Sequence, residues 1–548
     1  MPQLLLILGL VVAALLWQLR RVGRRPKDYP PGPPTLPLIG NLHLIPGERR
    51  HQQFLAWAEE YGPIYSLITA TKTIIVLNTD VAIKELLDKR GAIYSSRPDS
   101  YIAQTVLSKG MRVLFMENTP NGVWSGVRKM LHLILNITAA RTYVPYQDLE
   151  NKAMLLGMLE NPNDFINHLR RYAASLTTQM TFGFRTTSME DERIKRAYDL
   201  FDRSGEMIVS PIAGALDLFP ILRNLPAFLL SIKKEGQEMH RRELKLFREY
   251  YDGVKQGLQN GTAKPSISVD IVKMQKQEGL SDDLAAYIAG QILQAGSETT
   301  AGIVVGFIQA MVIFPEVAKA AQEELDRVCG RDRLPDLNDV PHLPYIRACA
   351  KECFRWMPGL LLGVPHAVTK DDSYMGYRIP KGSTVIMNVW AIHNDPKRHP
   401  DPRKFDPMRY INDNTSSMDS ANHADATKRD HFGFGAGRRR CQGMHIADRS
   451  IFLALSRLLW AFDFKRAKDP LTGEEIVPDM DELVDGILSM PKPFKCDIVP
   501  RDEHKARMVR EEWEEVRKLL DEEMQWKEVP KGMVWGDETP QITDDQVV

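Results

Sequence analysis

A stretch without proline, running from Ser281 up to Pro315, constrains the fold more than any other feature of the chain. Ser281 precedes Asp282 and Asp283, a pattern typical of a helix N-cap followed by acids in the first turn. At about 1.5 Å per residue the predicted helix is roughly 50 Å long. A helix of this length has to cross the whole body, so much of its surface is buried. Its many alanines and glycines, among them Ala295, allow another group to pack closely, and a flat cofactor is one candidate.

The remaining sequence pattern is mainly helical. Strand-like alternation is short and local, at 73–77 and 384–388. We therefore expect a mainly α fold with a small β region. The polar stretch 412–430 predicts a loop insertion that tolerates change. Helical periodicity is clearest at 54–61, 81–87, 239–258 and 318–328.

Composition narrows the class of protein. The chain has 71 Lys and Arg against 71 Asp and Glu, so its net charge of zero argues against a general nucleic-acid binder. The apolar fraction of 43% is that of a folded globular protein. Five scattered cysteines without a C-x-x-C pair do not form a disulfide framework, which is typical of a protein in a reducing compartment.

The N-terminus is typical of a membrane anchor. Leu4 to Leu19 is almost wholly apolar, and five basic residues follow between positions 20 and 27. A cleaved signal peptide is the alternative, but its positive charge would come before the apolar run. Charge after the run leaves the body on the cytosolic side. We therefore expect residues 1–28 to form a single transmembrane anchor in the endoplasmic reticulum membrane, separated from the body by the proline-rich segment 30–34.

The strongest chemical signal is the cysteine loop, residues 434–443, which reads Phe-Gly-Ala-Gly-Arg-Arg-Arg-Cys-Gln-Gly. If Cys441 binds a metal, each neighbour has a use. Gly437 and Gly443 let the backbone approach a large planar group, Phe434 can cover the sulfur, and N–H groups at a helix start favour a thiolate. A buried free cysteine, a glycine-rich anion loop and a zinc ligand are the alternatives, although zinc needs three more ligands nearby.

These ten residues match the F-x-x-G-x-R-x-C-x-G haem-binding signature of the cytochrome P-450 family at every fixed position. The chain resembles that family, and within it the fungal microsomal members near O-methylsterigmatocystin oxidoreductase. The resemblance implies the cytochrome P-450 fold with haem b as cofactor and Cys441 as the axial ligand of its iron. It also implies that Phe434, Arg439 and Gly443 belong to the cofactor site.

Two further segments resemble family motifs. Residues 295–300, Ala-Gly-Ser-Glu-Thr-Thr, resemble the oxygen-activation motif. The resemblance implies that Glu298 and Thr299 relay protons to dioxygen, while Ala295 and Gly296 clear space at the haem. Ordinary helix is the alternative, since a threonine often bonds the carbonyl four residues earlier. Residues 352–355, Glu-Cys-Phe-Arg, resemble the structural E-x-x-R pair, with Arg409 as a third member of a buried ionic cluster.

The haem propionates require hydrogen-bond donors. Residues 124–128, Trp-Ser-Gly-Val-Arg, resemble the family's W-x-x-x-R helix, in which both side chains lie on one face. For Arg97 the alternative is a surface salt bridge, and for His366 it is a satisfied strand histidine. By resemblance, the donors are Arg97, Trp124, Arg128, His366 and Arg439.

The resemblance implies a haem-thiolate monooxygenase that uses O₂ to hydroxylate a hydrophobic small molecule, in fungal secondary metabolism. It places substrate contacts at about 100–117, at 201–228, on the central helix before Ala295, at 360–363 and near 487–488. Electrons would come from NADPH through a separate cytochrome P-450 reductase, with cytochrome b5 as a second candidate donor, because the chain has no room for a flavin domain. A haem-thiolate isomerase or dehydratase and a non-enzymatic haem sensor are the alternatives.

The catalytic domain is expected to occupy residues 29–505. Residues 501–548 hold eight basic and fourteen acidic residues. We therefore interpret 506–548 as an acidic C-terminal extension, solvated or flexible, with a helical stretch near 509–525 and no catalytic role.

Overall fold

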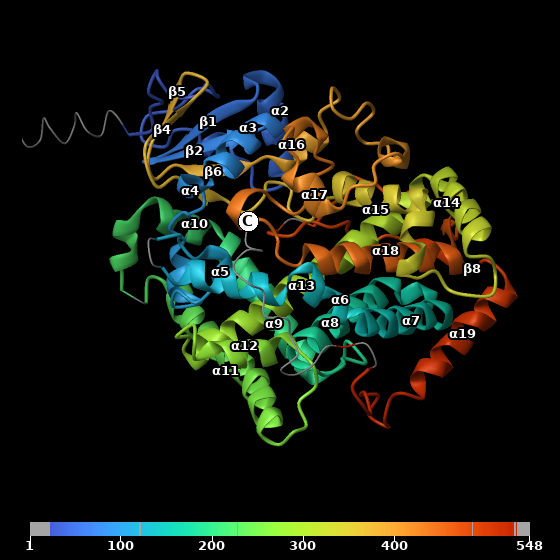
Figure 1. Cartoon of the computed structure of the whole chain (residues 1–548). Helices are drawn as coiled ribbons and strands as arrows, with labels where there is room; N and C mark the ends of the chain where they lie inside the picture. Colours follow the sequence, from blue (N-terminus) through green and yellow to red (C-terminus); the bar gives the residue numbers. More distant parts are fainter. Residues whose placement is uncertain (1–21, 120–121, 227, 485, 531–532, 534–548) are drawn as a thin grey trace, which may run out of the picture.

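The computed structural model describes residues 22–119, 122–226, 228–484, 486–530 and 533, and the predicted membrane anchor lies outside these ranges. Helices make up most of the molecule, and a small sheet region sits at one corner (Figure 1). The mainly α fold with a small β region is therefore confirmed. In chain order the helices are α2 (Arg50–Tyr61), α3 (Asp80–Ile83), α4 (Gly91–Tyr94), α5 (Val123–Ile134), α6 (Ile137–Thr142), α7 (Val144–Glu160), α8 (Phe165–Phe182), α9 (Glu192–Val209), α10 (Pro211–Leu218), α11 (Ser231–Gln259), α12 (Ile267–Gln275), α13 (Asp282–Ile313), α14 (Pro315–Val328), α15 (Pro344–Trp356), α16 (Val389–His393), α17 (Ser417–Asn422), α18 (Met444–Ala461) and α19 (Glu503–Arg517).

Three small sheets accompany the helices. The largest has the strand order β1-β2-β6-β3, in which β2 and β6 are parallel and the other neighbours antiparallel. The predicted strands at 73–77 and 384–388 correspond to β2 and β6. The strands are β1 (Ile64–Thr69), β2 (Lys72–Leu77), β3 (His366–Ala367), β4 (Asp372–Tyr374), β5 (Tyr377–Ile379), β6 (Thr384–Met387), β7 (Phe462–Arg466) and β8 (Cys496–Pro500).

Helix α13 is the predicted central helix, and it runs through the middle of the molecule (Figure 1). The Ser281 hydroxyl oxygen accepts a hydrogen bond from the Leu284 N–H at 3.2 Å, so the predicted N-cap is confirmed. A Cβ at Gly290 would lie 2.3 Å from the Phe247 ring of α11, and one at Gly296 would lie 2.7 Å from the Thr177 hydroxyl of α8. These two glycines therefore admit neighbouring helices. That Gly296 also clears space for a haem ligand stays a prediction.

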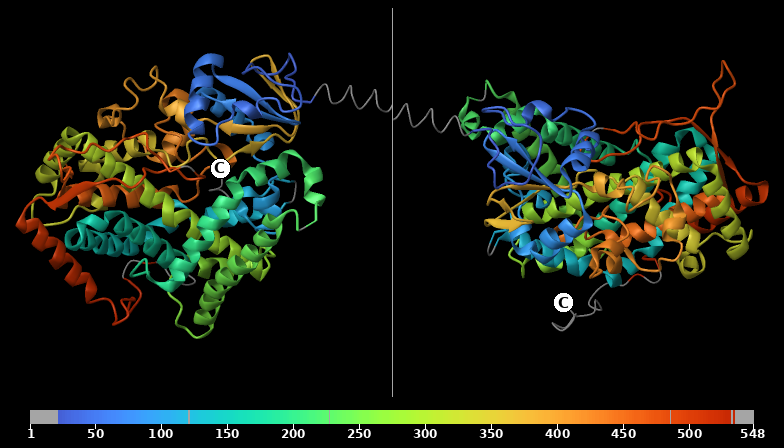
Figure 2. Two further views of the ribbon diagram at one scale, coloured as in Figure 1. Left: turned by 180° about the vertical axis from the view of Figure 1, so that it is seen from behind. Right: turned by 90° about the horizontal axis from the view of Figure 1, so that it is seen from above.

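The C-terminal segment 503–530 is packed against the body, contrary to the expectation of a solvated or flexible extension. Trp513, Leu520 and Trp526 are buried in the core although acidic residues surround them in sequence. The indole N–H of Trp526 donates a 2.7 Å hydrogen bond to the buried side-chain oxygen of Gln179. Helix α19 lies along the edge of the molecule in both views of Figure 2. Since the helix begins at Glu503, the expected boundary at 505 falls inside it.

The polar stretch 412–430 also holds more structure than the predicted loop. It contains α17, and the Ser420 hydroxyl accepts a hydrogen bond from the Asp430 N–H at 2.8 Å. Lys351 of α15 forms ion pairs with Asp413 at 2.7 Å and with Asp430 at 3.1 Å. These polar contacts fix both ends of the stretch to the body, which the amino-acid composition alone does not indicate.

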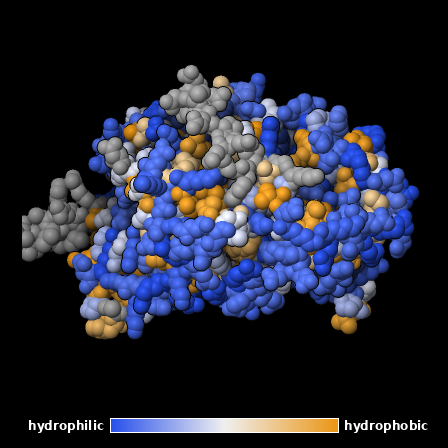
Figure 3. Space-filling model, turned by 60° about the horizontal axis from the view of Figure 1, so that its bottom comes forward, coloured by the Kyte–Doolittle hydropathy of each residue, from blue (hydrophilic) through white to orange (hydrophobic). Residues whose placement is uncertain are grey.

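The surface is polar over much of its area. The face in Figure 3 is mainly hydrophilic, with small separate hydrophobic groups. Within the described ranges α13 alone is long and apolar enough to cross a membrane, and 72% of its apolar window is buried inside the molecule, which is typical of a core helix. Exposed apolar side chains gather in the segment 209–229, namely Val209, Ile212, Phe219, Ile221, Leu225, Phe228 and Leu229.

Candidate functional site

The cysteine loop folds as a tight turn ahead of α18. The Cys441 N–H donates a 2.9 Å hydrogen bond to the Phe434 carbonyl and closes the loop. Gly437 has a φ of 64°, and a Cβ there would lie 2.1 Å from the Leu87 carbonyl oxygen. Glycine at 437 is therefore required by its backbone conformation and by its close neighbour. That this glycine also lets the backbone approach a planar group stays a prediction.

The Cys441 thiol differs from the other cysteines of the chain. Cys441 is exposed, whereas the other four are buried. Although Cys441 keeps solvent access, the protein atoms packed around it reduce hydration of the thiolate and so raise the pKa of Cys441, while the Gly443 backbone N–H and the charge of Arg128 lower it. Coordination to a metal ion would deprotonate the thiol. Cys441 is thus an accessible sulfur with cationic and N–H groups beside it.

The Phe434 side chain lies in a group of aromatic rings. The Phe434 ring packs against Phe354, with ring centroids 4.6 Å apart, and against His431 at 5.4 Å. That Phe434 covers the sulfur stays a prediction.

Across the described part of the chain no group of three or more His, Cys, Asp or Glu side chains could hold a metal ion. The geometry therefore gives no support to a zinc site at Cys441.

Arg97, Arg128 and Arg439 form an arginine trio without acidic partners in the described ranges. Burial lowers the pKa of Arg97 to about 9 and that of Arg128 to about 10. Burial, with the charges of Arg97 and Arg128, lowers the pKa of Arg439 to about 8. A guanidinium is not deprotonated in proteins, so these shifts report positive charge that lacks a counter-charge. An anionic group is needed at this place.

Backbone carbonyls and one aromatic ring fix the trio in position. The guanidinium of Arg439 lies 3.8 Å from the centroid of the Trp124 ring, a cation–π contact. Arg97 is buried, so the alternative of a surface salt bridge is wrong. The accepting carbonyls are those of Leu114, Val364 and Pro365 for Arg97, of Ser95, Val113 and Met116 for Arg439, and of Arg440 for Arg128.

Two other predicted donors, Trp124 and His366, differ in whether they already have a hydrogen-bond partner. Trp124 is buried on α5, and its indole N–H has no hydrogen-bond partner in the described ranges. His366 is buried on β3, and its Nδ1 lies 2.8 Å from the Tyr94 carbonyl. Burial and the charge of Arg97 lower the pKa of His366 to about 3. Its Nε2 can therefore donate to a carboxylate only after that carboxylate has raised its pKa.

The predicted oxygen-activation residues lie on an accessible part of α13. Ala295 and Thr299 are exposed although most of the helix is buried. The Thr299 hydroxyl donates to the Ala295 carbonyl at 2.8 Å, which is the bond that the ordinary-helix alternative expects. Burial, with the negative charge of Asp202, raises the pKa of Glu298. Glu298 therefore holds a proton more readily than an ordinary glutamate does.

These features together fit a haem group. The thiol of Cys441 can coordinate a metal ion, and the arginine trio can pair with two carboxylates. On the accessible side of α13, small residues such as Ala295 leave room for a planar group. Helix α13, which carries the oxygen-activation residues, packs against α18, the helix that follows the cysteine loop. A planar dianionic group with a central metal ion satisfies all three requirements.

The ionic cluster predicted from the E-x-x-R pair is present. Arg355 donates from Nε and Nη2 to the two oxygens of Glu352, both at 2.6 Å, and neither side chain is exposed. The Arg409 Nε lies 3.4 Å from Glu352. The cluster ties α15 to the segment before the cysteine loop, which supports its interpretation as structural.

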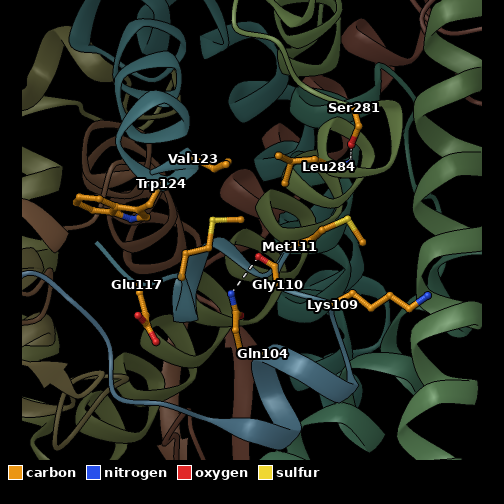
Figure 4. Close-up of a pocket in the computed structure, with 10 residues that line it drawn as sticks. Gln104, Lys109, Gly110, Met111, Glu117, Val123, Trp124, Ser281 and Leu284 are labelled. Atoms are coloured by element: carbon orange, nitrogen blue, oxygen red, sulfur yellow. Dashed lines mark hydrogen bonds between the residues drawn. The ribbon is translucent and has the colours of Figure 1, made fainter. Parts of the chain in front are cut away.

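Sequence reasoning did not single out Arg112, a further buried arginine, which donates to Glu243 and Gln294. A signal existed, because Tyr287, Gln291 and Gln294 recur at helical spacing in an apolar helix. A surface cavity of about 400 Å³ lies beside the segment 104–117, which contains Arg112 (Figure 4). Its lining includes Lys109, Gly110, Met111, Trp124 and Leu284.

Comparisons with known proteins agree with this geometry. The cytochrome P-450 family model matches residues 30–498. Cytochrome P-450 monooxygenase fogE of Aspergillus ruber is 61% identical over 97% of this chain and 98% of its own length. Cytochrome P-450 monooxygenase virE of Hypocrea virens is 58% identical over 98% of both chains. A zebra fish cytochrome P-450 structure with progesterone has a TM-score of 0.68 at 24% identity, covering 82% of this chain and 99% of that one, and shows the shared fold.

The family uses haem with a cysteine thiolate as axial ligand, and Cys441 is the cysteine of its signature. The family model and the two fungal relatives cover nearly the whole chain. The chain belongs to the cytochrome P-450 family and is a haem-thiolate monooxygenase.

Proposed function

We propose that this monooxygenase hydroxylates a hydrophobic small molecule in fungal secondary metabolism, with electrons from NADPH delivered by a separate cytochrome P-450 reductase and cytochrome b5 as a second candidate donor. The observation that carries the site is the accessible Cys441 beside an arginine trio without acidic partners. The two similar fungal proteins are both named as cytochrome P-450 monooxygenases, which supports the reaction class.

When bound, haem supplies iron with a thiolate ligand that favours cleavage of the O–O bond. Cys441 would hold the iron, and the arginine trio with Trp124 would orient the cofactor through its carboxylates. On the other side, Glu298 would hold a proton that Thr299 passes toward the oxygen. For this role the Thr299 O–H, which now donates to the Ala295 carbonyl, would turn to donate toward the oxygen, while the hydroxyl oxygen accepts a replacement proton from Glu298.

We propose that the enzyme is anchored in the endoplasmic reticulum membrane with its catalytic domain on the cytosolic side. The predicted anchor at 1–28 supports this location. The exposed apolar side chains of 209–229 would lie against the lipid interface, where burial of apolar area is favourable. Fractionation of cells that express the chain with and without residues 1–28 tests the location, and an unchanged membrane fraction would contradict the anchor.

A purified holoenzyme tests the core of the proposal. The reduced protein exposed to carbon monoxide should show the absorption maximum of cysteine-ligated haem, and Cys441→Ser should lose that maximum. Turnover by the wild type should require NADPH and the reductase. Turnover without either would favour the isomerase or dehydratase alternative. A haem band that no hydrophobic compound shifts would favour the haem-sensor alternative.

The natural substrate requires a metabolic experiment. Deletion of the gene in its source organism should cause one hydrophobic metabolite to accumulate. Supplying that metabolite to the holoenzyme with reductase, NADPH and O₂ should yield a product that is heavier by one oxygen atom. A pathway that runs unchanged without the gene would contradict the proposed metabolic role.

A further inference from the structure

A second surface cavity shares no residue with the haem site. Its volume is about 360 Å³, and its walls come from the end of α8, the start of α9, the last turns of α11 and the loop 262–264. Helices α8 and α9 both contact α11, in the lower part of Figure 1. No lining residue belongs to the oxygen-activation motif or to the segments expected to contact substrate. The chemistry described above therefore leaves this cavity without a function.

The cavity has an aromatic wall and an open side. The rings of Phe182, Phe184 and Tyr250 form the wall, with centroids 5.2, 5.7 and 6.2 Å apart. The guanidinium of Arg193 lies 4.4 Å from the centroid of the Phe184 ring. A Cβ added at Gly253 would have no atom within 4 Å, so the α11 backbone there faces open space. Such a surface accommodates a flat apolar ring.

One positive charge of this cavity lacks an acidic partner in the described ranges. Arg193 and Glu249 pair with oppositely charged side chains that do not line the cavity, at 2.6 and 3.0 Å. The ammonium group of Lys264 instead donates to the Lys527 carbonyl, at 3.5 Å. A ligand that combines a flat ring with a carboxylate would therefore match both the aromatic wall and Lys264.

The C-terminal part of the chain passes beside the cavity. Lys527, which contacts Lys264, follows directly after the docked Trp526. Farther along, Met533 is half-buried against the main hydrophobic core, to which the aromatic wall also belongs. Between Lys527 and Trp535 the chain can extend by up to about 29 Å, which is enough to reach the cavity.

The sequence that follows Met533 has the chemistry that the cavity requires. Residues 534–548 include four acids, one tryptophan and no lysine or arginine. Trp535 offers a large flat ring, and Asp537 and Glu538 follow two and three residues later. Because the segment is attached to the body, its effective concentration at the cavity is on the order of millimolar. A weak contact is therefore sufficient to keep it bound.

We propose that this cavity binds the segment 534–548 of its own chain. The indole of Trp535 lies on the aromatic wall beside Gly253. The carboxylate of Asp537 or Glu538 pairs with Lys264. The bound segment then ties α8, α9 and α11 together at their ends. The proposal goes beyond the reaction at the haem, because no residue of the haem site takes part in it.

Photo-cross-linking in the full-length holoenzyme tests this contact. Trp535 is replaced by p-benzoylphenylalanine, an aromatic residue that bonds covalently to a neighbour under near-ultraviolet light. Mass spectrometry should place the cross-link within 182–184 or 249–264. Gly253→Leu fills the open space and should lower the yield about three- to tenfold. Gly205→Leu on α9 is the matched control, because a Cβ there also meets no atom within 4 Å, and it should leave the yield unchanged.

Two further measurements examine the charge and the indole separately. Lys264→Glu, which reverses the charge, should also lower the cross-link yield, whereas Lys264→Arg should retain it. Hydrogen exchange needs no photoreactive group. In the full chain, Trp535→Ala should make the backbone amides of 258–264 exchange about threefold faster or more, because the segment no longer restrains the end of α11.

Several results would overturn the proposal. A cross-link elsewhere, no cross-link, or a yield that Gly253→Leu does not lower would each do so, as would exchange rates that Trp535→Ala leaves unchanged. Cross-linked dimers on a denaturing gel would show that the segment binds a second copy of the chain, which also overturns it. Loss of the carbon monoxide signal of cysteine-ligated haem would contradict the proposed function and not this contact.

Discussion

Replacing Arg439 by glutamine should loosen the haem. Arg439 has no acidic partner, and burial beside Arg97 and Arg128 lowers the pKa of Arg439 to about 8. A carboxylate of the cofactor would meet this charge with a hydrogen bond worth about 1.5–3 kcal/mol. Since each 1.4 kcal/mol is about a factor of ten, the variant should hold haem about 10- to 150-fold more weakly. Glutamine keeps an N–H group for the carbonyls that Arg439 now bonds, so the loop itself should survive.

The assay follows haem transfer from the purified holoenzyme to an excess of apomyoglobin, because weaker binding appears mainly as faster dissociation. Arg439→Lys should be intermediate, since it keeps the charge but loses the contact with Trp124. Arg378→Gln is the control, because Arg378 pairs with Asp28 at the exposed surface and should not affect the rate. Wild-type haem loss by Arg439→Gln would refute the assignment of the arginine trio to the propionates.

Three further predictions concern the oxygen-activation motif, the ionic cluster and the C-terminal segment. Thr299→Ala should retain haem but uncouple NADPH consumption from product, and equal coupling in both proteins would argue against the proton role. Glu352→Gln should leave Arg355 as an uncompensated buried charge and cost about 3–5 kcal/mol, seen as loss of folded holoprotein; a normal yield and melting temperature would contradict this. Trp526→Ala should lower the free energy of unfolding by about 3–5 kcal/mol, and Trp526→Phe, which leaves the buried Gln179 oxygen unpaired, by about 1–3 kcal/mol. Urea denaturation measures both, and values within about 0.5 kcal/mol of the wild type would show that the segment does not dock.

Sequence reasoning succeeded where one local pattern determines one structure. The cap at Ser281 and the absence of proline up to Pro315 were sufficient to predict α13. The ten-residue signature was sufficient to identify Cys441, because each of its fixed positions restricts the loop. The E-x-x-R pair is a local i,i+3 contact, so Glu352 and Arg355 could also be predicted.

Sequence reasoning failed where a residue's partner is distant in the chain. The sequence did not indicate that Gly296 lies against Thr177 or that Gly437 lies against the Leu87 carbonyl. The acidic C-terminus suggested a solvated tail, because charge dominates its composition. Trp526 is nevertheless buried, and its hydrogen-bond partner Gln179 lies far away in sequence.

The presence or absence of an acidic partner distinguishes Arg112 from the arginine trio. Arg97, Arg128 and Arg439 have no acidic partner in the described ranges, so the ligand itself must bring negative charge, as the propionates of haem do. Arg112 instead pairs with Glu243 on α11, with its Nη2 2.8 Å from both carboxylate oxygens. Haem would therefore be held with its carboxylates toward the trio, where no acid within the described ranges competes for the guanidinium groups.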